Sequence, residues 1–188
     1  WVSPEYRRRA RLKAAVMYGV NQPLQIEDVE VDDPRPNEVL IKTSASGVCH
    51  SDLHFMEGNY PTATPIVLGH ESAGVVEKIG SDVTRAKVGD RMVVAFVQSC
   101  GNCDNCVQGK PFICNNPGAQ SRGDRLKLNG EAMAQFAGMS AFAEYQLVHE
   151  NACVPVPDNL SMEVAAHVGC SVMTGVGAVT NTAKIAVG

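Results

Sequence analysis

The chain has 188 residues, a length that suits one domain or one domain with the start of another. Apolar residues make up 45% of the chain and charged residues 19%, which is typical of a globular protein and excludes an intrinsically disordered one. The net charge of -4 lacks the excess of lysine and arginine that nucleic-acid binding requires, so no nucleic-acid partner is expected.

The first 12 residues, which include a basic run at 7–11, are expected to form a frayed N-terminal extension. From residue 13 to about 41, short apolar runs alternate with glycine, asparagine, proline and acidic residues, which predicts strands. Further strands are predicted at 74–79, 91–97, 143–148 and 153–156, with turns at 33–37, 58–61 and 88–90.

Two later segments differ from this strand-rich pattern. At about 97–117 the apolar periodicity fades and glycine, asparagine, proline and cysteine dominate, which indicates a lobe without its own core. After residue 159, Ser161 precedes a run of good helix formers, so a helix or helix pair is predicted at 161–182. The fold class expected from these elements is mainly β with short helices.

No run of about 18 consecutive apolar residues and no charged-then-apolar leader occurs, so neither a membrane span nor a membrane partner is expected. The seven cysteines are an odd number, and four of them lie in one short stretch, which favours metal binding over disulfides. These features together favour a cytoplasmic location.

The four crowded cysteines have the spacing of a metal site. Cys100, Cys103, Cys106 and Cys114 bring four thiols within fifteen residues, close enough for one loop to surround a single ion. Four thiolates in a tetrahedron form a closed shell around zinc, which is typical of a structural site. An iron–sulfur cluster, disulfides and unrelated free thiols are the alternatives.

Three further residues have ligand chemistry: Cys49, His70 and Cys170. Spacing alone does not join them, and each also fits a packing role, the cysteines as small buried hydrophobes and the histidine as a hydrogen-bonded polar group.

Several segments in chain order resemble the zinc-dependent medium-chain alcohol dehydrogenases: Gly-His-Glu-Ser-Ala-Gly-Val-Val at 69–76, Gly-Asp-Arg at 89–91, the four-cysteine lobe, and Gly-Cys at 169–170. The resemblance covers about residues 13–188. It implies a GroES-like, partly open β-barrel at 13–182 that carries the zinc lobe, and a start of a dinucleotide-binding domain at 183–188.

The resemblance also implies two zinc ions, a structural one in the lobe and a catalytic one bound by Cys49, His70 and Cys170. Two thiolates and one neutral imidazole leave a fourth position for water or substrate. Zinc there would lower the pKa of an alcohol so that the alkoxide gives hydride to a nicotinamide. The expected reaction is the oxidation of alcohols to aldehydes or ketones, and its reverse.

Supporting roles follow from the same resemblance. Ser51 corresponds to the hydroxyl that takes the alcohol proton, His54 to the histidine that passes it to solvent, and His50 to a residue near the cofactor pyrophosphate. Asp52 and Glu71 are expected to support the metal ligands from behind. Tyr60 and Phe96 are expected to line a substrate pocket, with Phe55, Met56 and Phe142 nearby, whereas His149, Cys153 and His167 match no ligand position.

The chain departs from the family in lacking Gly-x-Gly-x-x-Gly, the fingerprint of the doubly wound (Rossmann) domain that would bind most of the NAD or NADP. We therefore expect these residues alone to bind zinc without turnover.

A small alcohol or aldehyde is the expected substrate, and a homodimer or homotetramer the expected assembly of the full-length enzyme. The alternatives are a thiol-adduct formaldehyde dehydrogenase, a non-catalytic zinc-stabilised GroES-like binding module and a zinc-free quinone-reductase-like protein. Cys170 disfavours polyol dehydrogenases, which tend to have glutamate there.

Overall fold

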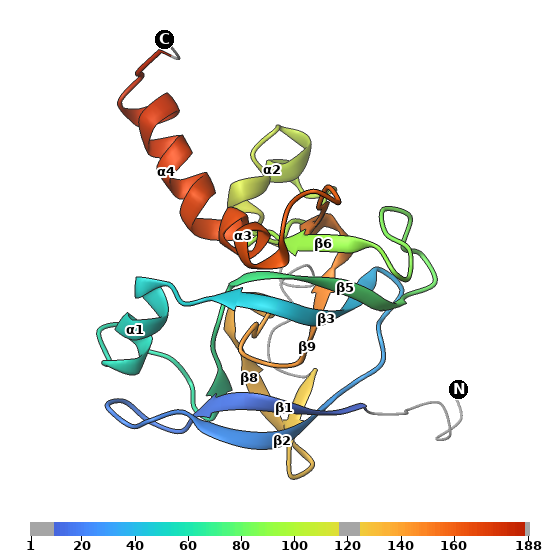
Figure 1. Cartoon of the computed structure of the whole chain (residues 1–188), viewed down its shortest axis with the longest axis vertical. Helices are drawn as coiled ribbons and strands as arrows, with labels where there is room; N and C mark the ends of the chain where they lie inside the picture. The colour runs from blue at the N-terminus through green and yellow to red at the C-terminus, as the bar shows by residue number, and fades with distance from the viewer. Residues whose placement is uncertain (1–9, 117–124, 187–188) are drawn as a thin grey trace.

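The computed structural model describes residues 10–116 and 125–186, and within these ranges two five-stranded sheets form the body of the molecule (Figure 1). One sheet closes into a barrel, in the order β1 (Ala10–Met17), β2 (Gln25–Val31), β7 (Leu126–Leu128), β8 (Glu131–Gln135) and β4 (Ile66–Val67). The other has the order β10 (Cys153–Pro155), β6 (Arg91–Val94), β5 (Glu71–Ile79), β3 (Glu38–Gly47) and β9 (Tyr145–His149). The expected mainly β fold with short helices is confirmed.

The central pair of the second sheet positions the functional residues. β3 and β5 are antiparallel, with register shifts between Leu40 and Ile41 and between Thr43 and Ala45. Such bulges bend a strand and increase its twist. At the end of the ladder Gly47 of β3 is paired with Glu71 of β5, so the segments that carry Cys49 and His70 emerge side by side.

Short helices lie beside the sheets. Helix α1 (His50–Met56) follows β3 directly, and α2 (Asp104–Val107) lies in the cysteine lobe. The segment predicted as helix at 161–182 is helical throughout, as α3 (Met162–His167), η6 (Val168–Val172), α4 (Met173–Gly177) and η7 (Ala178–Thr182). The Ser161 hydroxyl caps its start by accepting a hydrogen bond from the Val164 N–H at 3.3 Å.

The start of this long helical segment is fixed to the second sheet. Ala165 and Ala166 are buried and pack against Ala73 of β5 and Val93 of β6. Figure 1 shows α4 projecting beyond the sheets. Because the first turns are packed on β5 and β6, Cys170 in η6 is held close to the end of that sheet.

The helical segment also differs from one expectation. Over Met162–Thr182 it is long and apolar enough to cross a membrane, by length and composition alone, with 17% of its most apolar window buried. The sequence prediction counted consecutive apolar residues and missed it, because glycine, serine and threonine interrupt the run without making it hydrophilic. Ala165 and Ala166 in its first turns pack on the second sheet, whereas most of the side chains at 171–182 are exposed.

Element boundaries differ from the predicted ones in several places. β1 begins at Ala10, inside the extension expected at 1–12, since residues 10–16 pair with β2. The strand predicted at 91–97 ends at Val94, where the chain turns toward the cysteine lobe. Helix α1 and strands β4, β7 and β8 were not predicted. Residues 1–9, 117 and 187–188, which the predicted extension, lobe and second domain include, lie outside the described residues.

Candidate functional site

Four side chains from distant parts of the chain converge beside the end of the β3–β5 pair. Cys49, His70, Glu71 and Cys170 each offer one ligand atom, and these atoms all lie within 4.8 Å of one another. Cys49 is the N-cap of α1, His70 directly precedes β5, Glu71 is the first residue of β5, and Cys170 lies in η6. The fold thus brings together the three residues predicted as catalytic zinc ligands, with Glu71 beside them.

Two glycines allow this convergence. Gly69 has φ +91°, and a Cβ there would lie 2.7 Å from the backbone nitrogen of Phe142. Gly169 lies against β6, where a Cβ would collide with the Val94 carbonyl oxygen. Each glycine directly precedes a ligand, so close backbone packing sets the positions of His70 and Cys170.

Asp52 connects two of the ligands. Its Oδ1 accepts a hydrogen bond from the Gly69 N–H at 3.2 Å and lies 3.2 Å from His70 Nδ1, while Oδ2 accepts from the Cys49 N–H at 3.1 Å. The Asp52 side chain is fully buried. Because a carboxylate holds Nδ1, the Nε2 atom of His70 is the nitrogen left for a metal, as in many carboxylate–histidine–metal arrangements.

The pKa values in this cluster are shifted in different directions. Burial acts to raise the pKa of Cys49, but hydrogen bonds from Ser51 and the neighbouring His70 outweigh it, so the pKa falls below its ordinary value. Burial acts to lower the pKa of His70, but Asp52 and Cys49 raise it overall. Burial and the charges of Cys49 and Glu71 raise the pKa of Cys170 to about 11. Two thiols and a carboxylate at this spacing repel one another as anions, a repulsion that a bound cation relieves.

The Glu71 side chain has a partner that sequence analysis did not find. His167, in the last turn of α3, places Nδ1 at 2.9 Å from Glu71 Oε2. The Glu71 side chain is 2% exposed, whereas that of His167 is 53% exposed. The two residues are 96 positions apart, so no local signal in the sequence joins them.

The four-cysteine lobe has the dimensions of a zinc site. The Sγ atoms are 4.0 Å apart between Cys100 and Cys106, 3.9 Å between Cys103 and Cys114, and 3.7 Å between Cys114 and Cys100. A tetrahedron with zinc–sulfur bonds of about 2.3 Å has edges of about 3.8 Å. All four ligand atoms lie within 4.8 Å of one another, so the thiols fit a single closed zinc site without rearrangement.

Hydrogen bonds within the lobe prepare the thiols for a cation. Backbone N–H groups at Cys106 and Asn115 lower the pKa of Cys103 to about 6, while burial and the Cys103 sulfur raise that of Cys106 to about 11. The Cys103 thiol therefore ionises more readily than an ordinary cysteine and the Cys106 thiol less readily, and a bound metal displaces the protons of both.

A cavity of about 620 Å³ has aromatic walls that include Phe96 and Phe136, which pack against His70, although no residue of the ligand cluster lines it. The rings of Phe96 and Phe136 have their centroids 4.9 Å and 5.5 Å from that of His70, and Phe55 packs edge-on against Phe136 at 4.8 Å. Phe112 also lines the cavity, and its described lining includes no charged residue.

The family model described as "Alcohol dehydrogenase GroES-like domain" matches residues 35–158, well over half of the chain. The chain belongs to the zinc-dependent medium-chain alcohol dehydrogenase family. Its β3–β5 pair, its α1 and its cysteine lobe all lie inside the matched range.

Relatives and solved structures of this family match nearly all of the chain. It is 39% identical to alcohol dehydrogenase class-3 of Drosophila melanogaster over 184 residues (94% of this chain, 48% of the relative) and 39% identical to S-(hydroxymethyl)glutathione dehydrogenase of Photobacterium damsela subsp. piscicida over 181 residues (92% and 49%). An alcohol dehydrogenase zinc-binding domain protein from Burkholderia ambifaria superimposes with a TM-score of 0.87 at 35% identity (96% and 51%), and benzyl alcohol dehydrogenase from Acinetobacter calcoaceticus with 0.83 at 34% (94% and 49%). The chain spans about half the length of the curated relatives it matches.

The residues to which the family resemblance gave proton-transfer and cofactor roles lie along α1. The Ser51 hydroxyl lies 3.7 Å from Cys49 Sγ. His50 is exposed, and its ring centroid lies 4.6 Å from that of His54, whose Nδ1 is 3.1 Å from the Asn59 amide nitrogen. A hydroxyl and two histidines therefore extend from the cluster of Cys49, His70 and Cys170 toward the surface.

The residues expected to line the pocket are placed unequally. Phe96 and Phe55 line the aromatic cavity, as do Phe136 and Phe112, which sequence analysis missed. Tyr60 is 50% exposed and is not among the residues that line the cavity, but its ring centroid lies 5.5 Å from that of Phe55, which does line it. Phe112 and Phe136 gave no signal because phenylalanine outside a recognised motif has the appearance of core.

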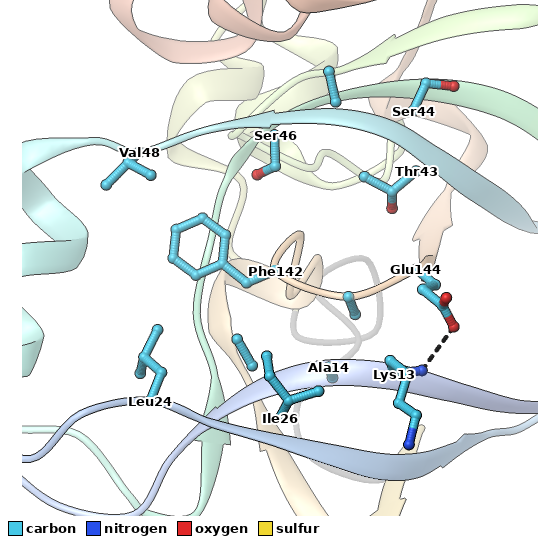
Figure 2. A pocket seen from close by; sticks show the side chains of 13 residues that line it. Lys13, Ala14, Leu24, Ile26, Thr43, Ser44, Ser46, Val48, Phe142 and Glu144 are labelled. Carbon is cyan, nitrogen blue, oxygen red and sulfur yellow. Dashed lines mark hydrogen bonds between the residues drawn. The ribbon is translucent and has the colours of Figure 1, made fainter.

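Phe142 belongs to a different hollow. A cavity of about 500 Å³ has Phe142 and Ile26 among its walls, and the Lys13 N–H donates to the Glu144 carboxylate at 2.8 Å. Figure 2 shows these side chains between the β1–β2 pair and β3. This cavity contains no member of either ligand cluster. It shares Leu24, Val48 and Phe142 with a smaller cavity that reaches Cys49.

Proposed function

We propose that this chain is the metal-binding catalytic part of a zinc- and nicotinamide-dependent dehydrogenase that interconverts alcohols with aldehydes or ketones. The observation that carries the proposal is the convergence of Cys49, His70 and Cys170 beside an aromatic cavity, with Asp52 orienting the histidine. A purely structural site would need no adjoining cavity.

The residues at this cluster fit a catalytic zinc. Two cysteine sulfurs and one histidine nitrogen are the ligand set of such sites in alcohol dehydrogenases, with the fourth position left open. Zinc bound there supplies a Lewis acid that lowers the pKa of an alcohol. Cys100, Cys103, Cys106 and Cys114 would hold the structural zinc, which replaces the hydrophobic core that their lobe lacks.

The chain's own side chains would guide the substrate proton. Ser51 stands next to Cys49 and takes the alcohol proton, and His54 passes it toward solvent. His50 is exposed on the same helix and would contact the cofactor pyrophosphate. NAD or NADP would be bound mainly by a part of the protein outside these residues, in agreement with the proposed division into a catalytic domain at 13–182 and the start of a nucleotide-binding domain at 183–188.

The cavity favours an uncharged apolar substrate. Phe55, Phe96, Phe112 and Phe136 supply aromatic walls, and the described lining residues include no lysine or arginine. An aromatic or small primary alcohol is therefore the proposed substrate class. The second candidate is a thiol-adduct formaldehyde dehydrogenase, which the similarity to the Photobacterium relative favours.

A non-catalytic zinc module is disfavoured because it would not require Cys49, His70 and Cys170 to converge.

The free thiols of both clusters fit a reducing compartment, so the proposed location is the cytoplasm. The proposed assembly is a homodimer or homotetramer.

The test uses the protein at its natural length, zinc-loaded, with NAD or NADP and either benzyl alcohol or formaldehyde plus glutathione. We expect reduced nicotinamide to form with benzyl alcohol, and Cys49→Ala to abolish it. Activity with the glutathione adduct alone supports the second candidate. No activity with either substrate from a protein that holds both zinc ions contradicts the proposal.

A further inference from the structure

Glu71 contributes one potential ligand too many for an open metal site. Cys49, His70 and Cys170 already supply the three ligands that a catalytic zinc uses, and a Glu71 carboxylate oxygen lies within the same 4.8 Å. A fourth protein ligand would close the coordination shell and add a negative charge to two thiolates. The side chain that controls this carboxylate therefore controls access to the metal.

His167 holds that carboxylate directly. Its Nδ1 lies 2.9 Å from Glu71 Oε2, and because a carboxylate can only accept, the imidazole N–H donates. The hydrogen bond engages one of the acceptor sites of the carboxylate and fixes the direction in which its oxygens point. Glu71 is 2% exposed, so water does not compete effectively for the same oxygen.

Gly47 leaves the space in which the Glu71 and His167 side chains meet. A Cβ at Gly47 would collide with Glu71 Oε2 and come within 3.0 Å of both Cε1 and Nδ1 of the His167 ring. The hydrogen-bonded Glu71 and His167 side chains thus lie against the backbone of Gly47 at the end of β3. Because α3 is packed on β5 and β6 through Ala165 and Ala166, the imidazole has a fixed anchor.

We propose that His167 is a positioning residue that holds the Glu71 carboxylate back from the metal and thereby keeps the fourth coordination position open. The inference rests on the proposed function, because it requires a metal bound by Cys49, His70 and Cys170. His167 is not among the residues whose ligand atoms converge, so it would act through Glu71.

The test measures an open coordination position with the metal and a small ligand alone. The protein at its natural length is loaded with Co²⁺ at the catalytic site, and imidazole is titrated while the visible d–d bands are recorded. We expect wild type to bind imidazole and His167→Leu to bind it at least about tenfold more weakly, the usual scale for changes beside a metal ligand. His167→Asn, which keeps a side-chain N–H, is expected to behave as wild type.

A double variant separates positioning from damage to the fold. In His167→Leu/Glu71→Gln the competing carboxylate is gone, so imidazole binding should return to within about threefold of that of Glu71→Gln alone. Val164→Leu, which places leucine one turn earlier on α3 at a position 55% exposed, is the matched control and should leave imidazole binding unchanged.

Each outcome decides the inference. Unweakened imidazole binding in His167→Leu, or no recovery in the double variant, overturns the positioning role while leaving the metal site intact. If His167→Leu does not fold, His167→Ala, which also removes the side-chain N–H, takes its place: weaker imidazole binding in His167→Ala than in His167→Asn supports the role, and equal binding in the two overturns it. Absence of a second metal in wild type overturns the proposed function and this inference together.

Discussion

Asp52 Oδ1 lies 3.2 Å from His70 Nδ1, and both side chains are buried. The same carboxylate accepts the N–H of Cys49, so one buried aspartate fixes two of the three proposed ligands. Loss of a group that orients a metal-binding histidine typically lowers metal affinity by about 10- to 100-fold.

Asp52→Asn is therefore expected to weaken zinc binding at the catalytic cluster by about 10- to 100-fold, because the amide cannot stabilise the same imidazole orientation. Competition with a coloured chelator measures the affinity. Asp104→Asn on the exposed face of α2 is the matched control and should leave this site unchanged. Equal affinities in wild type and Asp52→Asn would contradict the orienting role.

A buried cation holds the barrel to the second sheet. Arg125 is 4% exposed and forms ion pairs with Asp32 at 3.2 Å and with Glu38, itself 4% exposed, at 2.8 Å. Arg125→Met removes the cation that pairs with the buried Glu38 carboxylate and should reduce the free energy of unfolding by about 3–5 kcal/mol. Denaturant unfolding measures the change.

Lys78→Met is the control for Arg125→Met, since Lys78 pairs with Asp33 at 2.9 Å where its side chain is 49% exposed. Its loss should cost less than about 1 kcal/mol. A similar cost for the two variants would show that burial does not strengthen the Arg125 network.

The lowered pKa of His149 predicts a change in stability near neutral pH. Burial lowers its pKa below 6.5 in the folded protein, although Glu150 and Glu38 partly oppose this. As the pH falls through 6.5 the unfolded chain takes up the proton first, so His149 contributes stability above this pH and loses it progressively toward the lower folded-state pKa.

His149→Asn removes the titration and keeps a side-chain acceptor for the Asn151 N–H, which His149 Nδ1 accepts at 3.1 Å. The free energy of unfolding is measured for both proteins from pH 8 down to pH 5. The difference between them should be constant well above pH 6.5 and should shift against wild type below it. A difference that does not change with pH would exclude a depressed His149 pKa. Metal loss affects both proteins and cancels in the comparison.

How much the sequence could predict depends on how local each signal is. Cys100, Cys103, Cys106 and Cys114 were joined by spacing because a single loop carries them all. Cys49, His70 and Cys170 were joined only by family resemblance, since their contact depends on the β3–β5 register and on the packing of Gly169 against β6.

Other features gave no signal at all. His167 was placed among packing or surface residues because the hydrogen bond to Glu71 arises only when α3 packs against the sheet. Helix α1 was missed because it is seven residues long and begins at a cysteine, which is not a usual N-cap residue. Strands β4, β7 and β8 were missed because they have two to five residues, too few to establish an alternating pattern.

The zinc content of the purified chain and its cysteine variants tests the central claim most directly. Two zinc ions per chain are predicted for wild type, and one for Cys49→Ala, which should lose the catalytic zinc. Cys103→Ala should instead lose the structural zinc, and the stability of the lobe should fall with it. Elemental analysis after removal of loosely bound metal gives these values. A single zinc in both wild type and Cys49→Ala would contradict the account, because the Cys49, His70 and Cys170 cluster would then hold no metal.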